Sequence, residues 1–160
     1  MPTKKPSKIL VGVLGLPIRK DKKFYLTRRY APGRPSWHKM WQVAGGGLEF
    51  GEKPEETLKR EMMEELQVTV DIIHPQPIVK TQIWFGKELD EKEDTQLVLI
   101  TYLINIKNQQ PDFSKDDETT EGKWHTFDEV LKLNSLPLTD EILKEAQIIC
   151  NKYALWRVLY

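Results

Sequence analysis

The chain has 160 residues, of which 39% are hydrophobic and 30% charged, proportions typical of a folded globular domain. Lys and Arg together number 24, as do Asp and Glu, so the formal net charge of zero gives no reason to expect a nucleic acid or an anionic membrane as partner. The single cysteine, Cys150, excludes an internal disulfide, argues against a cysteine-rich zinc site and favours a cytoplasmic setting. The length predicts one domain over residues 9–160, preceded by a flexible basic tail over residues 1–8.

The first half of the chain begins with a continuous apolar run, residues 9–18, rich in β-branched side chains. The run is too short to cross a bilayer, which takes about 20 residues, and it predicts a strand covered on both faces. Proline and glycine make residues 31–40 a loop. The predicted strands of this half are 9–18, 24–28 and 41–44, the last running into three glycines.

A helix is predicted from Pro54 to Leu66. Proline suits the first helical turn, where its missing N–H costs nothing. The acidic side chains of Glu52, Glu55 and Glu56 complement the positive end of the helix dipole.

The second half also combines apolar segments with polar loops, which are an acidic loop at 88–94 and a polar, irregular stretch at 108–122. The predicted strands are 68–73, 78–85, 96–106 and 124–127. A helical turn is predicted at 128–133, and an amphipathic helix starts at Thr139 or Asp140 and runs to about Ala154. This interleaving predicts a layered α/β domain.

Three glutamates of the first helix share one face, because Glu61, Glu64 and Glu65 stand at helical spacings. Like charges at these positions destabilise a helix, and Mg²⁺ or Mn²⁺ would offset the repulsion. A merely solvated acidic face is the alternative. Gly45, Gly46 and Gly47 lie one loop upstream, where a backbone carbonyl could approach a cation or a phosphate.

The spacing of this segment resembles the Nudix box. That pattern begins with a glycine, five residues, a glutamate and seven residues. It continues with Arg-Glu, an aliphatic residue, any residue, Glu-Glu, any residue, a glycine and an aliphatic residue. Gly46, Glu52 and Arg60 begin the match, and Met62 is accepted as the first aliphatic residue. Gln67 stands in place of the usual glycine, just past the helix. There we expect a left-handed backbone, which costs a non-glycine residue about 1–2 kcal/mol.

The resemblance implies a Nudix-type α/β/α sandwich with a mixed β-sheet. It also implies a metal site made by Glu61, Glu64, Glu65 and the carbonyl of Gly45. Arg60 would orient the carboxylates, and Glu52, with Gly46, would brace the loop. The general base would be Glu61, with Glu64 as the alternative. A further acidic ligand, Glu118 or Glu121, would precede Trp124; a solvated loop position is the alternative for each.

The implied reaction is hydrolysis of a nucleotide-type small molecule, with a (deoxy)nucleoside triphosphate giving a monophosphate and pyrophosphate. ADP-ribose or another sugar nucleotide is an alternative substrate, and a Nudix-like binding module without turnover is an alternative function. Trp84 and Phe85 could stack on a base or pack in the core. Arg28 and Arg34, from a basic cluster that also holds Arg29, His38 and Lys39, could meet phosphates or be solvated. The chain would act as a monomer or a homodimer.

Overall fold

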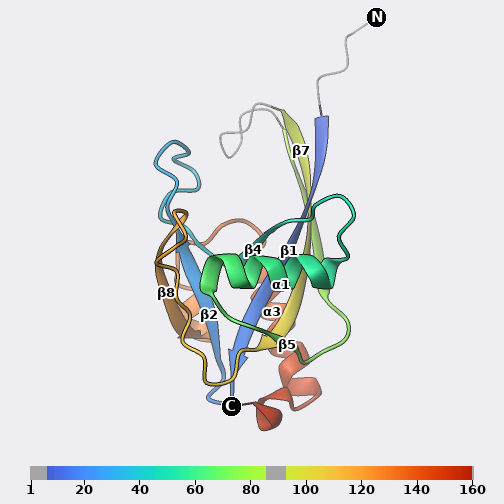
Figure 1. Cartoon of the computed structure of the whole chain (residues 1–160), viewed down its shortest axis with the longest axis vertical. Coiled ribbons are helices and arrows are strands. Elements are labelled where there is room, and N and C mark those ends of the chain that lie inside the picture. Colours follow the sequence, from blue (N-terminus) through green and yellow to red (C-terminus); the bar gives the residue numbers. More distant parts are fainter. Residues whose placement is uncertain (1–6, 86–92, 160) are drawn as a thin grey trace, which may run out of the picture.

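The computed structural model describes residues 7–85 and 93–159. Residues 1–6 of the predicted tail and residues 88–92 of the predicted acidic loop lie outside this range. The elements in chain order are β1 (Ser7–Arg19), β2 (Lys23–Arg29), β3 (Trp41–Gln42), β4 (Ala44–Gly47), α1 (Pro54–Leu66), β5 (Asp71–Ile72), β6 (Ile78–Trp84), β7 (Asp94–Asn105), β8 (Thr119–Thr126), α2 (Phe127–Val130), α3 (Thr139–Lys152) and the 3₁₀ helix η2 (Leu155–Val158) (Figure 1).

The sheet is organised around β1, the long apolar strand. It pairs in parallel with β7, from Ser7 opposite Asp94 to Pro17 opposite Ile104, and antiparallel with the glycine strand β4. Its last residues form a hairpin with β2, which also pairs with β3 and β8. β6 and β5 pair antiparallel with β7. The sheet is therefore mixed, as the sequence predicts.

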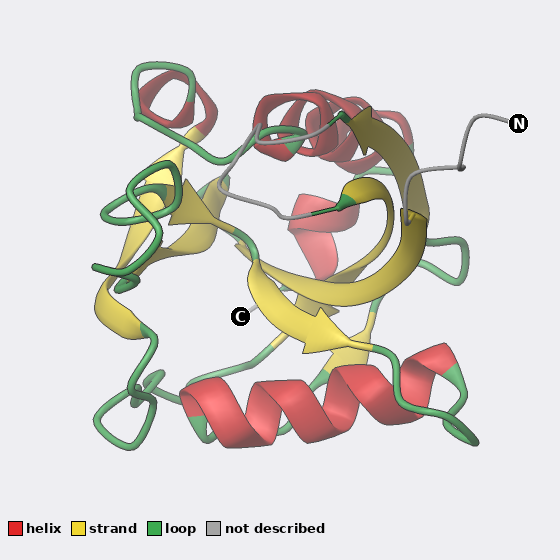
Figure 2. Ribbon diagram, turned by 90° about the horizontal axis from the view of Figure 1, so that it is seen from above, coloured by secondary structure: helices red, strands yellow, loops and turns green. Residues whose placement is uncertain are grey.

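Helices cover both faces of this sheet, with α1 on one side and α3 on the other (Figure 2). Alternate residues of β1 point to opposite faces. A Cβ on Gly15 would come within 2.8–2.9 Å of Leu58, Met62 and Ile104, which shows how closely α1 approaches the strand. The next residue, Leu16, belongs to a second hydrophobic cluster, which contains the buried hydrophobic residues of α3. The predicted α/β/α sandwich is confirmed.

The start and end of α1 follow from its sequence. Pro54 occupies the first turn, and the Glu56 carboxylate accepts the N–H of Lys53 at 2.9 Å. Gln67 takes the expected left-handed conformation, with φ 53° and ψ 41°. Its side-chain amide donates to the carbonyl of Asp112 at 3.2 Å, which offsets part of the backbone strain.

Several predicted boundaries were wrong. Ser7 and Lys8 belong to β1 and not to the tail, and the strand expected at 68–73 is reduced to β5. The stretch expected to be irregular ends early, because β8 already begins at Thr119, where it pairs with Arg29. The helical turn after β8 comes one residue sooner than predicted, and α3 stops at Lys152, with η2 beyond it. None of the helices in the described residues is long and apolar enough to span a bilayer.

Candidate active site

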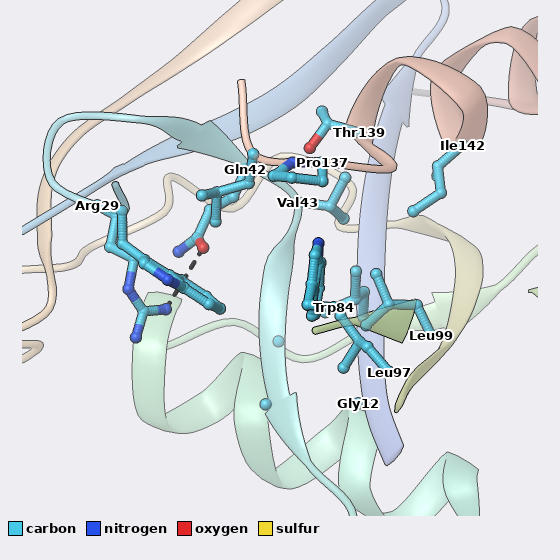
Figure 3. Close-up of a pocket in the computed structure, with 15 residues that line it drawn as sticks. Gly12, Arg29, Gln42, Val43, Trp84, Leu97, Leu99, Pro137, Thr139 and Ile142 are labelled. Atoms are coloured by element: carbon cyan, nitrogen blue, oxygen red, sulfur yellow. Dashed lines mark hydrogen bonds between the residues drawn. The ribbon is translucent and has the colours of Figure 1, made fainter. Parts of the chain in front are cut away.

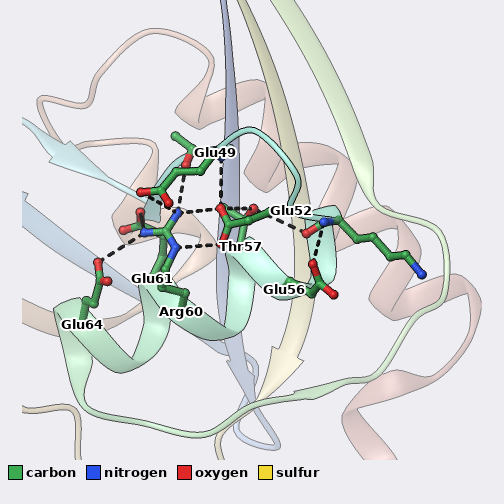
Figure 4. Close-up of polar contacts among 9 residues, drawn as sticks. Glu49, Glu52, Glu56, Thr57, Arg60, Glu61 and Glu64 are labelled. Atoms are coloured by element: carbon green, nitrogen blue, oxygen red, sulfur yellow. Dashed lines mark hydrogen bonds and ion pairs between the residues drawn. The ribbon is translucent and has the colours of Figure 1, made fainter.

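Arg60 is the centre of the polar network on α1 (Figure 4). Its Nε and Nη2 atoms donate to the Glu52 carboxylate, each at 2.9 Å. Nη1 donates to Glu61 at 2.7 Å and to Glu64 at 3.4 Å, and Nη2 also reaches the carbonyl of Gly47 at 3.1 Å. Forked, charge-assisted contacts of this kind are stronger than neutral hydrogen bonds. Arg60 therefore ties the loop before α1 to the carboxylates of the helix.

Glu52 is held from several sides. Its carboxylate accepts the backbone N–H of Glu49 at 3.0 Å and the hydroxyl of Thr57 at 3.1 Å, besides the Arg60 guanidinium. The bond from Arg60 is the main reason why the pKa of Glu52 falls to about 2. A carboxylate with so low a pKa is a poor proton acceptor near neutral pH.

Glu61 lies against the glycine strand β4. A Cβ on Gly46 would overlap the Glu61 carboxylate, so glycine leaves the room that this side chain occupies. Gly45 has a φ of +148°, and a Cβ there would collide with the backbone of Val13 and Leu14. Burial raises the pKa of Glu61, while its bond to Arg60 acts in the opposite direction.

Glu65 is the most strongly perturbed carboxylate of the helix. Its Oε2 atom accepts the backbone N–H of Gly45 at 3.1 Å. Burial, and then the negative charges of Asp116 and Glu61, raise the pKa of Glu65 to about 8. Strongly shifted groups of this kind concentrate at functional sites, although structural ion-pair networks also produce them.

A cleft of about 590 Å³ opens beside these carboxylates, and Glu61, Glu65 and Glu118 all line it. Arg29 and Arg34 line the same cleft. Arg29 Nη2 is 3.8 Å from Glu118 Oε2. The buried Nε atom of Arg29 has no hydrogen-bond partner among the described residues.

Trp37 contacts both arginines at the cleft. The guanidinium carbons of Arg34 and Arg29 lie 4.3 and 5.0 Å from the centroid of its ring, within cation–π range. The cleft therefore brings acidic, basic and aromatic side chains together.

A narrower apolar slot of about 150 Å³ continues from the cleft, and the two share Gly12, Arg29, Trp37, Gly45, Gly46 and Leu97. Trp84, Leu97, Leu99 and Ile142 point into it (Figure 3). Gln42 and Thr139 add polar groups to the wall, and Arg29 Nη1 donates to Gln42 Oε1 at 3.5 Å. We call this space the base slot.

Some residues singled out from the sequence lie elsewhere. Arg28 donates to the carbonyl of Lys39 at 2.9 Å and pairs with Glu121 at 3.5 Å, and neither Arg28 nor Glu121 lines the cleft. Phe85 follows the end of β6, is 65% exposed and lines a different depression. The Glu64 side chain is 59% exposed and reaches Arg60, but it does not line the cleft.

Other residues at the site were not singled out from the sequence. Arg29 was named only as one of a basic cluster, while Trp37, Gln42 and Asp116 were passed over. Consecutive strand residues point to opposite faces, so Arg28 and Arg29 had to differ in orientation. The pairing register of β8 shifts between Arg28 and Arg29, and of these two side chains only Arg29 lines the cleft.

The donor set suits a hard divalent cation. Within residues 7–85 and 93–159, no three His, Cys, Asp or Glu side chains converge as closely as a complete metal-binding group requires. The donors at the cleft are carboxylate and carbonyl oxygens, which Mg²⁺ and Mn²⁺ prefer. Glu65 also carries like-charged neighbours, Asp116 and Glu61, whose repulsion a cation would offset. The residues present therefore fit such an ion.

Comparison with known proteins gives a consistent result. A family model described as the NUDIX domain matches residues 8–146. The chain is 27% identical over 124 residues to the nucleoside triphosphatase NudI of Enterobacter sp. (strain 638), and the match covers 78% of this chain and 86% of that protein. It is 38% identical over 102 residues to the RNA pyrophosphohydrolase of Acinetobacter baylyi; that match covers 56% of this chain and 60% of the relative.

Solved structures share the fold. The MutT NUDIX hydrolase from Burkholderia pseudomallei superposes with a TM-score of 0.67 at 21% identity, over 86% of this chain and 97% of that one. The MutT protein from Methanosarcina mazei Go1 gives a TM-score of 0.68 at 20% identity, over 93% of this chain and 99% of that one. At this level of identity the similarity shows the fold alone. Together with the match to the family model, which spans most of the chain, it shows that this protein belongs to the NUDIX family of hydrolases.

Proposed function

We propose that this Nudix hydrolase converts a (deoxy)nucleoside triphosphate to the monophosphate and pyrophosphate, with Mg²⁺ or Mn²⁺. The observation that carries the proposal is the single cleft lined by Glu61, Glu65 and Glu118 and also by Arg29 and Arg34. Carboxylates can hold cations there while the arginines bind phosphate oxygens. The relative named as a nucleoside triphosphatase supports a triphosphate as the substrate, and the one named as an RNA pyrophosphohydrolase supports cleavage that releases pyrophosphate.

Glu61, Glu65 and the carbonyl of Gly45 would hold the cation, with Glu118 as a further ligand. Glu64 does not line the cleft and would have to turn away from Arg60 to join them. A divalent cation bound there neutralises phosphate charge and lowers the pKa of a bound water. Glu118 is favoured over Glu121 because it lines the cleft, whereas Glu121 pairs with Arg28.

Water attacks a phosphorus atom, one P–O–P bond breaks, and pyrophosphate leaves. Glu61 accepts the proton of the attacking water, and it is favoured over Glu64 because its carboxylate lines the cleft. Arg60 acts by positioning, because it fixes Glu61 against the loop that Glu52 anchors. The reaction consumes one water and releases the monophosphate, pyrophosphate and one proton.

The rest of the nucleotide is held by the other parts of the cleft. Arg29 and Arg34 bind phosphate oxygens, and Arg29 suits this role because its present partners are distant. Trp84 lines the base slot and packs against the base. Arg28 and Phe85, which lie outside the cleft, have no part in this arrangement.

The proposal is tested by measuring product release from a panel of NTPs, dNTPs, ADP-ribose, sugar nucleotides and dinucleoside polyphosphates, with Mg²⁺ or Mn²⁺ and with a chelator. We expect metal-dependent turnover that is fastest with a triphosphate. Fastest turnover of ADP-ribose or a sugar nucleotide would replace the proposed substrate. Tight nucleotide binding with no turnover on any member would identify a binding module instead.

A further inference from the structure

The base slot is small. Its volume of about 150 Å³ lies well below the roughly 300–1,000 Å³ of pockets that take drug-sized ligands. An apolar cavity of about 150 Å³ in another protein holds one benzene ring. The slot therefore has room for one six-membered ring.

The walls of the slot are firmly packed. Trp84 is 5% exposed and Ile142 is 1% exposed, so both belong to the core. Leu97 and Leu99 are held in β7, which pairs with strands on both sides. Enlarging such a site requires displacement of close-packed side chains, which is costly.

The polar groups of the slot suit an uncharged ring with a hydrogen-bonding edge. Gln42 offers two amide N–H donors, while its Oε1 atom already accepts from Arg29 at 3.5 Å, and Thr139 offers a hydroxyl. Among the described residues, no carboxylate or lysine lines the slot, and its one charged side chain is Arg29, which the slot shares with the cleft. Its glycine wall, Gly12, Gly45 and Gly46, continues into the acidic cleft, so a ring in the slot can be joined to phosphates beside Glu61 and Glu65.

We propose that the base slot selects a single-ring base, so that the preferred substrates are pyrimidine nucleoside triphosphates and not purine ones. This inference rests on the proposed triphosphate hydrolysis at the neighbouring cleft. A purine inserts only its six-membered ring, and its second ring stays at the mouth and holds the ribose and phosphates farther from the carboxylates. Misplacement by about 1 Å can cost about 10²-fold in rate, so discrimination appears in kcat as well as in KM.

The first experiment compares kcat/KM for dCTP and dTTP with that for dATP and dGTP at saturating Mg²⁺. One surplus methylene in an apolar pocket is worth about 10–200-fold, and a second ring adds more than a methylene. We therefore expect pyrimidines to be preferred by at least about tenfold. Binding of the corresponding monophosphates without metal gives a second readout, in which dCMP and dTMP bind more tightly than dAMP and dGMP.

The second experiment enlarges the slot. Leu99→Ala removes part of its wall, and Leu136→Ala does so from a loop, with less risk to folding. Each should raise the purine-to-pyrimidine ratio of kcat/KM about tenfold. Val98→Ala is the matched control, because Val98 neighbours Leu99 on β7 but its side chain points to the other face of the sheet. It should leave the ratio unchanged.

Equal or better use of purines by the wild-type protein would overturn the inference. So would folded Leu99→Ala and Leu136→Ala variants with the same ratio as Val98→Ala. A failure of the proposed function has a different signature: no triphosphate is hydrolysed, whatever its base. In that case the metal-free monophosphate binding still decides whether the slot selects a single ring.

Discussion

The acidic end of the cleft and the base slot are built in opposite ways. The acidic end comes mainly from one continuous stretch, from the glycines of β4 to the end of α1, and Arg60 holds it together through hydrogen bonds. The slot is assembled from β1, β2, β3, β6, β7 and α3 around the same glycines of β4, and its shape comes from packing. In the proposed function, local sequence therefore sets the chemistry and distant elements set the selectivity. The two ends should therefore respond differently to substitution.

The largest effect should come from the acidic end, at Glu65. Glu65→Gln should lower kcat about 10²–10³-fold, the loss seen when one group that stabilises transition-state charge is removed. The same variant should not lower Tm, because burial and the nearby charges of Asp116 and Glu61 already disfavour an ionised Glu65. Steady-state kinetics and thermal melting measure the two outcomes. Glu55→Gln, another glutamate of α1 outside the cleft, is the control; wild-type kcat in Glu65→Gln would contradict the assigned role.

Arg60→Lys should affect both rate and stability. Lysine cannot reproduce the fork that joins Glu52, Glu61 and Gly47. We expect kcat to fall about 10²-fold through misplacement of Glu61. Loss of charged hydrogen bonds should lower the free energy of unfolding by about 2 kcal/mol. Urea unfolding with parallel kinetics tests this, and a change in KM alone would show that Arg60 does not position the carboxylate.

Arg29 and Arg28 provide a direct comparison of two neighbouring side chains. Arg29→Met should raise KM for a triphosphate about tenfold or more, because one charged hydrogen bond is worth about 1.5–3 kcal/mol. Arg28→Met should leave KM unchanged, because Arg28 contacts Lys39 and Glu121 outside the cleft. Equal KM values for the two variants would show that Arg29 does not bind the substrate.

The smallest effect concerns pH and the anchor Glu52. Its pKa is about 2 in the folded chain against an ordinary value of 4.5, so the ionised form stabilises the fold fully above about pH 4.5. That contribution is lost as the pH falls from there towards 2. The difference in Tm between the wild-type protein and Glu52→Gln should therefore be constant from pH 7 to 5 and shrink below. A difference that stays constant down to pH 3 would contradict the pairing with Arg60.

The contrast between features set by local sequence and features set by packing of distant elements also explains what could be predicted from the sequence. The helix that carries Arg60 follows from the local sequence, while the mixed sandwich and the left-handed Gln67 follow from the resemblance to the Nudix box; the structure bears out all three. The position of Arg29 at the cleft depends on which face of β2 is turned towards the cleft, and the start of β8 at Thr119 depends on pairing with β2. Neither feature can be read from the residues of the strand itself, because each depends on how that strand sits against the rest of the sheet. The base slot was missed for the same reason, because no short pattern marks residues that meet only through packing.

The central claim is that the carboxylate-lined cleft cuts a triphosphate with a divalent cation. Phosphorus NMR of the products of a nucleoside triphosphate tests it most directly, since it identifies the anhydride bond that is broken. We expect monophosphate and pyrophosphate, formed only when Mg²⁺ or Mn²⁺ is present. Diphosphate and inorganic phosphate as the products, or turnover that a chelator leaves unchanged, would contradict the account.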